Sequence, residues 1–212
     1  PSKPFTRRPM NRRVFRLSLW LCIPAVGILM AIWQPNAPTP GSSLELVPKT
    51  TLASAKFNLI DHYGNPITEK ILQGSPAALF FGFTHCPDIC PTTLWTLDQY
   101  LSTLSQEGFA LPGFFITVDP LRDTPEVMKE HLANFNGTIT GITGSSDEIK
   151  KLLKNWKVYT KIVPLEGTDY TIDHTASVYL IDANGILRDT LKYQESRENS
   201  LVKLRQFLTA SK

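Results

Sequence analysis

The sequence contains little cysteine, and it has neither an internal repeat nor a low-complexity tract. Only three of its 212 residues are cysteine. Cys22 lies within an apolar run, where a thiol behaves as a small apolar side chain. Cys86 and Cys90 therefore remain as the only pair in the rest of the chain, and such a pair forms either a structural disulfide or a reactive site.

Acidic residues are missing from the beginning of the chain. No acidic residue precedes Glu45, whereas six Lys and Arg residues lie between Lys3 and Arg16. The formal net charge of +3 therefore becomes −3 when this basic head is set aside. Because the excess positive charge is confined to the head, the pI of 8.8 does not indicate a nucleic-acid partner.

Charged residues are also absent between Leu17 and Trp33, and this apolar run is long enough to span a bilayer. Positive charge before the run and none directly after it predicts a cytoplasmic head and a main domain on the far side. A cleaved signal peptide is the alternative, although no clear small-residue cleavage site follows the run. The expected parts are a basic head at 1–16, a transmembrane anchor at 17–33, a linker at 34–49 and one domain at 50–212.

The main domain alternates strand patterns with helix patterns. The apolar run from Ala77 to Phe83 is typical of a central strand that is buried on both faces, and a leucine stripe predicts a helix over Thr92–Gln106. Further strands are expected at 57–61, 114–118, 138–142, 176–181 and 186–189, and further helices at 125–135, at 146–156 and at the end of the chain. The polar stretch 164–169 is expected to be a loop. This order predicts an α/β thioredoxin-like fold with a mixed central sheet.

Cys86 and Cys90 follow the end of the central strand, where ligands and chemistry gather in open α/β sheets. Their spacing on one turn puts the Cα atoms about 6 Å apart, which permits a disulfide and equally a shared metal ion. A helix N-terminus favours the thiolate that both roles need. Thiol exchange ordinarily uses Cys-x-x-Cys, so the additional residue is a departure. Two thiolates with one imidazole suit copper better than zinc, because structural zinc usually takes four protein ligands.

Three of the four histidines are weak candidates for a third ligand. His131 lies within a predicted helix, where a packing or surface role is expected. His62 lies in a turn before the core strands. His85 adjoins Cys86, and adjacent side chains at a strand end point apart, which disfavours shared coordination.

His174 lies near the end of the domain, where it leads into the strand expected at 176–181. A neighbouring loop would be able to bring it over the cysteine turn. From the residue pattern alone, an ordinary structural role for a single loop histidine remains the simpler interpretation.

Three segments together resemble the signature segments of the Sco/SenC family of copper-binding cytochrome c oxidase assembly proteins, in the family's order. They are Phe81-Gly-Phe-Thr-His-Cys-Pro-Asp-Ile-Cys-Pro91, Val118-Asp-Pro-Leu-Arg-Asp-Thr-Pro125 and Asp173-His-Thr175. The resemblance extends from about residue 53 to residue 207. It implies that Cys86, Cys90 and His174 bind Cu(I) or Cu(II). The 119–125 segment is expected to form a turn and a helix cap, with Arg122 available for pairing.

The resemblance also implies a partner and a location. Family proteins help to deliver copper to the CuA centre of cytochrome c oxidase subunit II, so a membrane-anchored copper chaperone with a monomeric domain is expected. The expected location is the bacterial inner membrane with the domain in the periplasm; the mitochondrial inner membrane and intermembrane space are the alternative. A thiol-disulfide oxidoreductase, with Cys86 attacking and Cys90 resolving, is the competing function.

Overall fold

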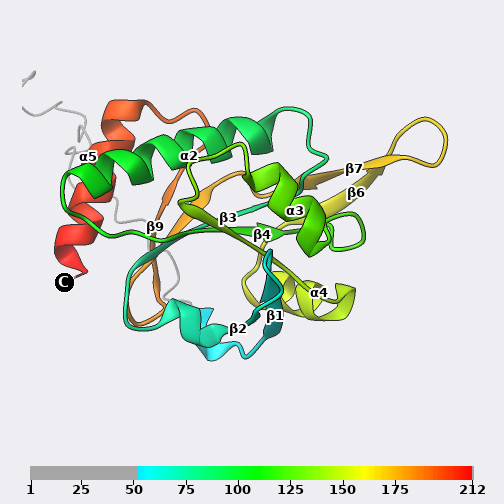
Figure 1. Cartoon of the computed structure of the whole chain (residues 1–212), viewed down its shortest axis with the longest axis horizontal. Helices are drawn as coiled ribbons and strands as arrows, with labels where there is room; N and C mark the ends of the chain where they lie inside the picture. Colours follow the sequence, from blue (N-terminus) through cyan, green and yellow to red (C-terminus); the bar gives the residue numbers. More distant parts are fainter. Residues whose placement is uncertain (1–51, 212) are drawn as a thin grey trace, which may run out of the picture. The chain divides into compact units, whose positions relative to one another are not determined.

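The computed structural model describes residues 52–211 (Figure 1). In chain order the elements are η1 (Leu52–Ser54), β1 (Asn58–Asp61), β2 (Pro66–Thr68), η2 (Glu69–Leu72), β3 (Ala77–Gly82), α2 (Ile89–Gln106), β4 (Gly113–Thr117), α3 (Pro125–Leu132), β5 (Ile139–Thr143), α4 (Ser146–Asn155), β6 (Thr160–Pro164), β7 (Tyr170–His174), β8 (Val178–Ile181), β9 (Leu187–Leu191) and α5 (Arg197–Ala210). Within residues 52–211 no helix combines the length and the apolar character needed to cross a membrane. The predicted head, anchor and linker lie outside the described residues.

Seven strands form one mixed sheet with the order β2-β1-β5-β4-β3-β8-β9. β3 pairs in parallel with β4 and antiparallel with β8, and β4 pairs in parallel with β5. All six residues of β3 are buried, as expected for an apolar strand that is covered on both faces. The predictions of a mixed sheet and of β3 as a central strand are therefore confirmed.

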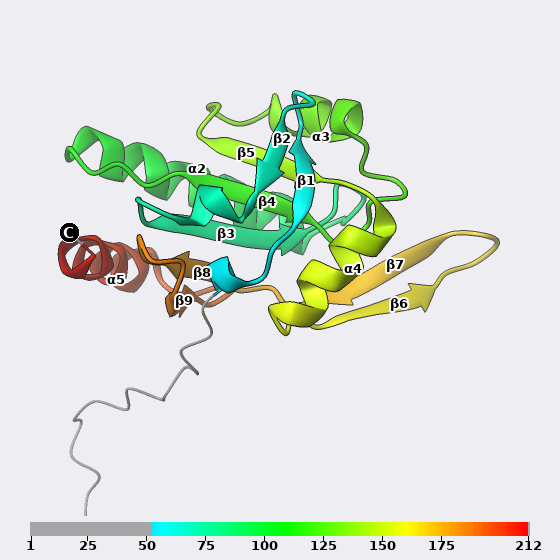
Figure 2. The ribbon, with the colours of Figure 1, turned by 90° about the horizontal axis from the view of Figure 1, so that it is seen from below.

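Helices cover both faces of this sheet. On the face of α2, a Cβ added to Gly113 of β4 would lie 2.6 Å from Leu101 Cδ1, so the helix packs directly on the strand. On the other face, the Phe81 and Trp156 rings meet edge to face beside α4, with their centroids 5.8 Å apart. Figures 1 and 2 show α2 and α4 on opposite sides of the sheet. The ends of β3 and β4 are consequently buried between two layers of helix.

The helices begin at the residues that elementary capping rules favour. The Thr124 hydroxyl accepts a hydrogen bond from the Val127 amide at 3.4 Å, and Pro125 occupies the first helical position of α3. α2 starts at Ile89, three residues earlier than predicted. Pro91 therefore lies inside the first turn, where a missing N–H leaves no hydrogen bond unmade.

Between α4 and β8 the structure adds two strands, β6 and β7, that the sequence did not predict, and the expected loop lies between them at 165–169. The stretch expected to be a loop is the tip of an antiparallel ribbon formed by β6 and β7, which projects beside the main sheet (Figure 2). The residues of β6 are exposed apart from Val163, which is half-buried. A strand with no buried face shows no alternation of apolar and polar residues, so periodicity did not reveal it. His174 also ends β7, rather than leading directly into β8.

Candidate metal centre

The two cysteines lie on either side of the start of α2. Cys86 is in the turn after β3, where its amide donates to the Phe83 carbonyl at 3.2 Å. Cys90 is the second residue of α2 and is fully buried, whereas Cys86 is half-buried. Both thiols are free. Cys90 thus lies in the first helical turn, where the unpaired amides and the helix dipole favour a negative charge.

Gly82, the last residue of β3, leaves the space that the Cys90 sulfur occupies. A Cβ at this position would lie 2.7 Å from Cys90 Sγ and 2.9 Å from a ring carbon of Phe115. No side chain larger than hydrogen fits without moving the sulfur or the ring. The glycine of the Phe-Gly-Phe segment is therefore required by the position of the thiol and not by a turn.

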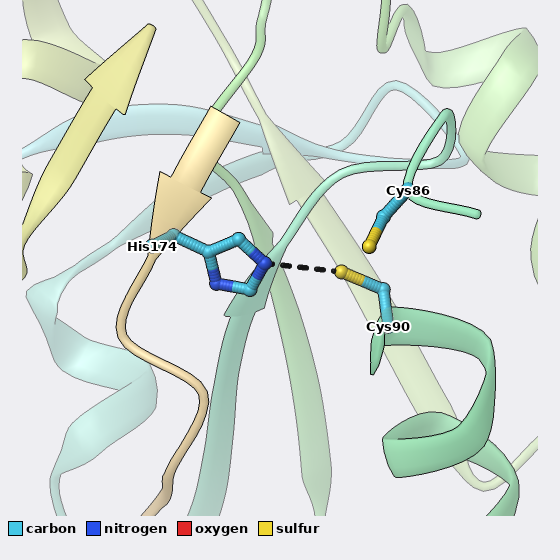
Figure 3. Close-up of side chains that lie close together, drawn as sticks. All are labelled: Cys86, Cys90 and His174. Atoms are coloured by element: carbon cyan, nitrogen blue, oxygen red, sulfur yellow. Dashed lines mark hydrogen bonds between the residues drawn. The ribbon is translucent and has the colours of Figure 1, made fainter. Parts of the chain in front are cut away.

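His174 reaches the thiols from the end of β7 (Figure 3). Its Nε2 lies 3.3 Å from Cys90 Sγ, and its Nδ1 lies 3.0 Å from the Thr175 carbonyl oxygen. Because a carbonyl can only accept, Nδ1 carries the proton, and the lone pair of the neutral ring is on Nε2. The Phe80 and Phe83 rings lie edge-on to the imidazole, with centroids 6.1 and 5.9 Å away. The histidine is thus oriented for coordination by a backbone hydrogen bond and two aromatic walls.

The pair of thiols is electrostatically asymmetric. The hydrogen bond from Cys90 lowers the pKa of the Cys86 thiol well below its usual value, and it outweighs the opposing effect of burial. The same hydrogen bond, together with burial, raises the pKa of the Cys90 thiol. The half-buried member, Cys86, is therefore the thiolate, and the fully buried member, Cys90, holds the proton.

The donor atoms of Cys86, Cys90 and His174 all lie within 4.8 Å of one another. These residues form the one such group of His, Cys, Asp and Glu side chains in residues 52–211 that is able to hold a metal ion. Two sulfurs and one imidazole nitrogen, which belong to one buried and two half-buried side chains, suit copper. The donor set, the tautomer of His174 and the space at Gly82 all fit such an ion.

The other three histidines lie apart from this group. The His85 ring is 51% exposed, and its Nδ1 lies 3.0 Å from the Thr84 hydroxyl. His62 is buried and accepts the Gly141 amide through Nδ1 at 2.8 Å. His131 packs beside Phe115 and Phe135, and burial lowers the pKa of its imidazole. The prediction that His131 packs within its helix agrees with its position.

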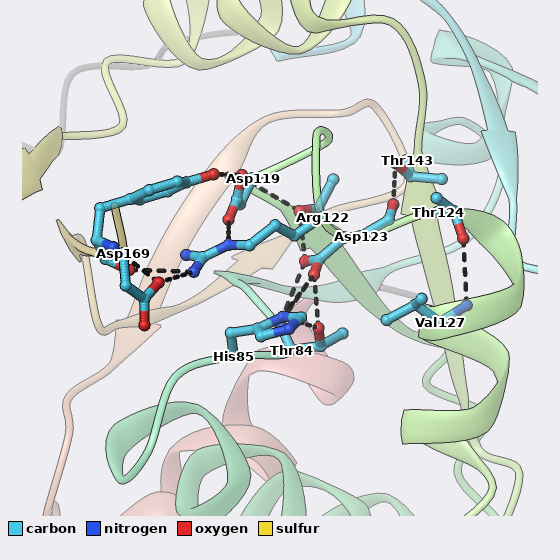
Figure 4. A network of polar contacts seen from close by, with 11 residues as sticks. Thr84, His85, Asp119, Arg122, Asp123, Thr124, Val127, Thr143 and Asp169 are labelled. Atoms are coloured by element: carbon cyan, nitrogen blue, oxygen red, sulfur yellow. Dashed lines mark hydrogen bonds and ion pairs between the residues drawn. The ribbon is translucent and has the colours of Figure 1, made fainter. Parts of the chain in front are cut away.

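A buried carboxylate that the sequence did not single out holds the cysteine turn in place. Asp123 accepts hydrogen bonds from the Thr84 hydroxyl and the Thr117 hydroxyl, both at 2.6 Å, and from the Thr84 amide (Figure 4). Burial raises the pKa of the Asp123 carboxyl. Because Thr117 ends β4, Asp123 joins the turn after β3 to the neighbouring strand. The Asp123-Thr-Pro125 segment is the only sign of this role in the sequence, and its pattern predicts a turn and a helix cap rather than a buried carboxylate.

Arg122 connects the ribbon to the body of the domain. Its Nη1 donates at 3.1 Å to the Asp169 carboxylate and at 3.1 Å to the Tyr170 carbonyl, and its Nε donates to Asp119. The guanidinium lies 3.8 Å from the centre of the Tyr170 ring, and the Tyr170 hydroxyl donates to Asp119 at 2.9 Å. The predicted pairing role of Arg122 is confirmed. Its partners place β7, and therefore His174, relative to the cysteine turn.

Known proteins resemble this chain in sequence. The SCO1/SenC family model matches residues 47–209. The mitochondrial protein SCO2 of Saccharomyces cerevisiae is 41% identical over 157 residues, which cover 73% of this chain and 52% of the relative. A SCO2-like protein of Rickettsia prowazekii is 36% identical over 178 residues, which cover 83% of this chain and 86% of the relative. The chain thus spans about half the length of the yeast relatives that it matches.

A solved structure resembles the domain as well. The structure of Bradyrhizobium japonicum ScoI with copper bound superposes with a TM-score of 0.67 at 38% identity. The match covers 72% of this chain and 98% of that chain. The predicted thioredoxin-like α/β fold with a mixed sheet is therefore confirmed.

Proposed function

Because this chain belongs to the SCO1/SenC family, we propose that it is a copper chaperone that carries the ion on Cys86, Cys90 and His174. The observation that supports this role most directly is the grouping of the three donor atoms within 4.8 Å, with the His174 lone pair turned toward Cys90. The copper-bound structure of the Bradyrhizobium relative supports the choice of metal. Copper is here the cargo, and three ligands leave a coordination position through which an acceptor's ligand can enter.

The acceptor we propose is subunit II of cytochrome c oxidase, at its CuA centre. The apolar run at 17–33 supports a single-pass anchor, with the domain on the side of the membrane opposite the basic head. The bacterial inner membrane and the periplasm are the proposed location. A tether of this kind keeps the domain close to a membrane-bound acceptor and raises its effective concentration there.

Copper titration of the full chain tests the proposal. One Cu(II) ion per chain is expected, with an absorption band from thiolate-to-copper charge transfer. His174→Ala removes the imidazole nitrogen, and the affinity is expected to fall by about 100-fold or more with a shifted band. His131→Ala, which removes an imidazole outside the site, is the matched control. An unchanged affinity and spectrum in His174→Ala would contradict the assignment of the ligand.

Thiol-disulfide exchange is a second candidate, and the asymmetry of the two thiols favours it. The Cys86 thiolate would attack a disulfide of an exported partner, and one partner sulfur would leave as a thiolate. Cys90 would give its proton to the partner thiolate released first and then attack Cys86 in the mixed disulfide, which releases the second partner sulfur as a thiolate. The partner gains two electrons, and the Cys86–Cys90 pair becomes a disulfide that no longer binds copper. His174→Ala is expected to retain this reaction, which separates it from copper transfer.

A further inference from the structure

β6 is an edge strand whose outer side is open. It pairs only with β7, in a sheet of two strands. The hydrogen bonds from the Thr175 amide to the Tyr159 carbonyl and from the Leu165 amide to the Asp169 carbonyl fix which residue pairs are bonded across the ribbon. Since bonded and non-bonded pairs alternate in an antiparallel ribbon, the peptide groups of Thr160 and Ile162 point away from β7.

This outer edge is accessible. Thr160 is exposed, and Ile162 is 64% exposed, which makes it one of the most exposed large apolar residues of residues 52–211. Figure 2 shows β6 on the side of the ribbon that faces away from the main sheet. Exposed edges of this kind accept an added strand, because each new hydrogen bond satisfies a peptide group that water alone had solvated.

The edge lies next to a concentrated positive charge. The segment 150–161 contains five lysines and no acidic residue, and all five are exposed. Residues 50–212 carry 15 Lys and Arg and 18 Asp and Glu, so the remainder of the domain outside this segment has a net charge of −8. In the described residues only Lys151 of the five forms an ion pair, with Glu148 at 3.7 Å. An acidic partner is therefore attracted to the lysine-rich segment 150–161 and repelled by the net negative charge of the rest of the domain.

The ribbon places the edge close to the metal centre. Thr160 pairs directly with His174 across the ribbon. Strands are spaced about 4.8 Å apart, so a strand added to β6 would lie roughly 10 Å from β7. A protein docked in this way has its own side chains within reach of the site that holds His174.

We propose that β6 is a docking edge for an extended acidic segment of a protein partner, which adds as a third strand to the β6–β7 ribbon. Backbone hydrogen bonds to Thr160 and Ile162 provide affinity, and Lys154, Lys157 and Lys161 select acidic side chains. A second copy of this chain is disfavoured as the occupant, because edge-to-edge pairing would oppose the two sets of lysines. A lipid surface is also disfavoured, because hydrocarbon leaves outward peptide groups unsatisfied. That the docked partner is a copper acceptor rests on the proposed function.

Amide hydrogen exchange on the full chain tests the docking edge. The probe is a synthetic peptide of about six residues that alternates Val and Glu, the length of a typical strand. It is expected to slow exchange at Thr160 and Ile162 by about tenfold or more, while Lys161 and Val163, already bonded to β7, change little. An alternating Val-Lys peptide is the matched control and is expected to have no effect.

Two pairs of variants separate the contribution of the backbone hydrogen bonds to peptide binding from that of the lysine charges. Ile162→Pro removes an outward N–H, a change that an edge strand tolerates. It is expected to abolish the protection of the Thr160 amide by the Val-Glu peptide. Ile162→Val keeps the N–H and is the control. Lys154→Glu combined with Lys157→Glu is expected to weaken peptide binding about tenfold, whereas Lys70→Glu on another surface is not. Unchanged exchange at Lys161 and Val163 shows that the ribbon is intact in each variant.

Three outcomes would overturn the proposal. The first is unchanged exchange at Thr160 and Ile162 with millimolar peptide. The second is protection of these amides by anionic phosphatidylglycerol vesicles and not by the peptide. The third is slow exchange of these amides when neither peptide nor vesicles are present, together with dimers of the chain in analytical ultracentrifugation. Copper stoichiometry is measured on the same samples, so a chain that binds copper but not the peptide refutes the docking edge alone, and the reverse result refutes the copper site alone.

Discussion

The cysteine turn and the β6–β7 ribbon supply ligands to one site, but they are held by different forces. The turn follows a strand whose six residues are all buried, and the buried Asp123 carboxylate accepts a hydrogen bond from Thr84 in this turn. The ribbon lies outside the main sheet, has an exposed strand, and is attached near its tip through Arg122. The sulfurs are therefore fixed by a fully buried strand and its turn, whereas the imidazole depends on the edges of the Phe80 and Phe83 rings and on the polar contacts of the ribbon. Copper binding should respond differently to changes in the two regions.

The largest effect is expected from the turn itself. Cys90→Ala removes a sulfur that contacts both other ligands, so we expect loss of detectable copper binding and of the charge-transfer band. The fold should be kept, because the side chain is small and alanine leaves a limited cavity. The measurement is a copper titration with circular dichroism as a check of the fold. Cys22→Ala is the control, and full binding by Cys90→Ala would show that the ribbon holds copper without the core thiol.

Alkylation of the apo protein tests the asymmetry within the turn. Because the pKa of Cys86 is lowered, its thiolate persists as the pH falls, and its reaction with iodoacetamide should change little between pH 8 and pH 5. An ordinary thiol loses roughly tenfold in rate per pH unit below its usual pKa of about 8.5. Cys90, buried and with a raised pKa, should remain unmodified throughout this range. Mass spectrometry of the labelled peptides distinguishes the two cysteines. An ordinary pH profile for Cys86 would contradict the assignment of the thiolate to Cys86 and of the proton to Cys90.

Gly82→Ala tests whether the core positions the sulfur. The added Cβ meets Cys90 Sγ at 2.7 Å, so we expect copper affinity to fall by about tenfold or more and stability by about 1–3 kcal/mol. Gly113→Ala is the matched control, because its Cβ meets Leu101 Cδ1 at 2.6 Å, away from the site. Both variants should lose stability in denaturant titrations, but only Gly82→Ala should lose copper affinity. Equal losses of affinity would mean that general destabilisation is the cause.

The smallest effect is expected from the attachment of the ribbon. Arg122→Lys removes the fork that reaches Asp119 and the Tyr170 carbonyl together, so His174 should be held less well and copper affinity should fall by about tenfold. Arg188→Lys alters a similar pair with Asp182, which lies in the β8–β9 turn, and should leave affinity unchanged. If Arg122→Lys also leaves affinity unchanged, the ribbon is held by its base and the contrast between the two regions is weaker than proposed.

Much of the main sheet could be predicted because its strands are buried. The apolar run of β3 and the leucine stripe of α2 reflect burial directly, and the caps of α3 and α4 follow from single residues such as Thr124 and Ser145. The β6–β7 ribbon could not be predicted, because β6 has no buried residue and Ile172 is the one buried residue of β7, so neither strand shows an apolar run or a regular alternation. The role of Asp123 was also hidden, since its partner Thr84 is 39 residues away in the chain.

The sequence by itself determined the pair of thiols, their spacing and their place at the end of a central strand, because these are local features of consecutive residues. It left His174 as one of four histidines until the family resemblance selected it. Only the tertiary structure decided how that imidazole meets the sulfur of Cys90, 84 residues earlier, with Nδ1 bonded to the Thr175 carbonyl and Nε2 directed toward Cys90. The physical reason is that a ligand outside the core is positioned by long-range contacts, through Arg122 and Tyr170, which leave no periodic pattern in the chain.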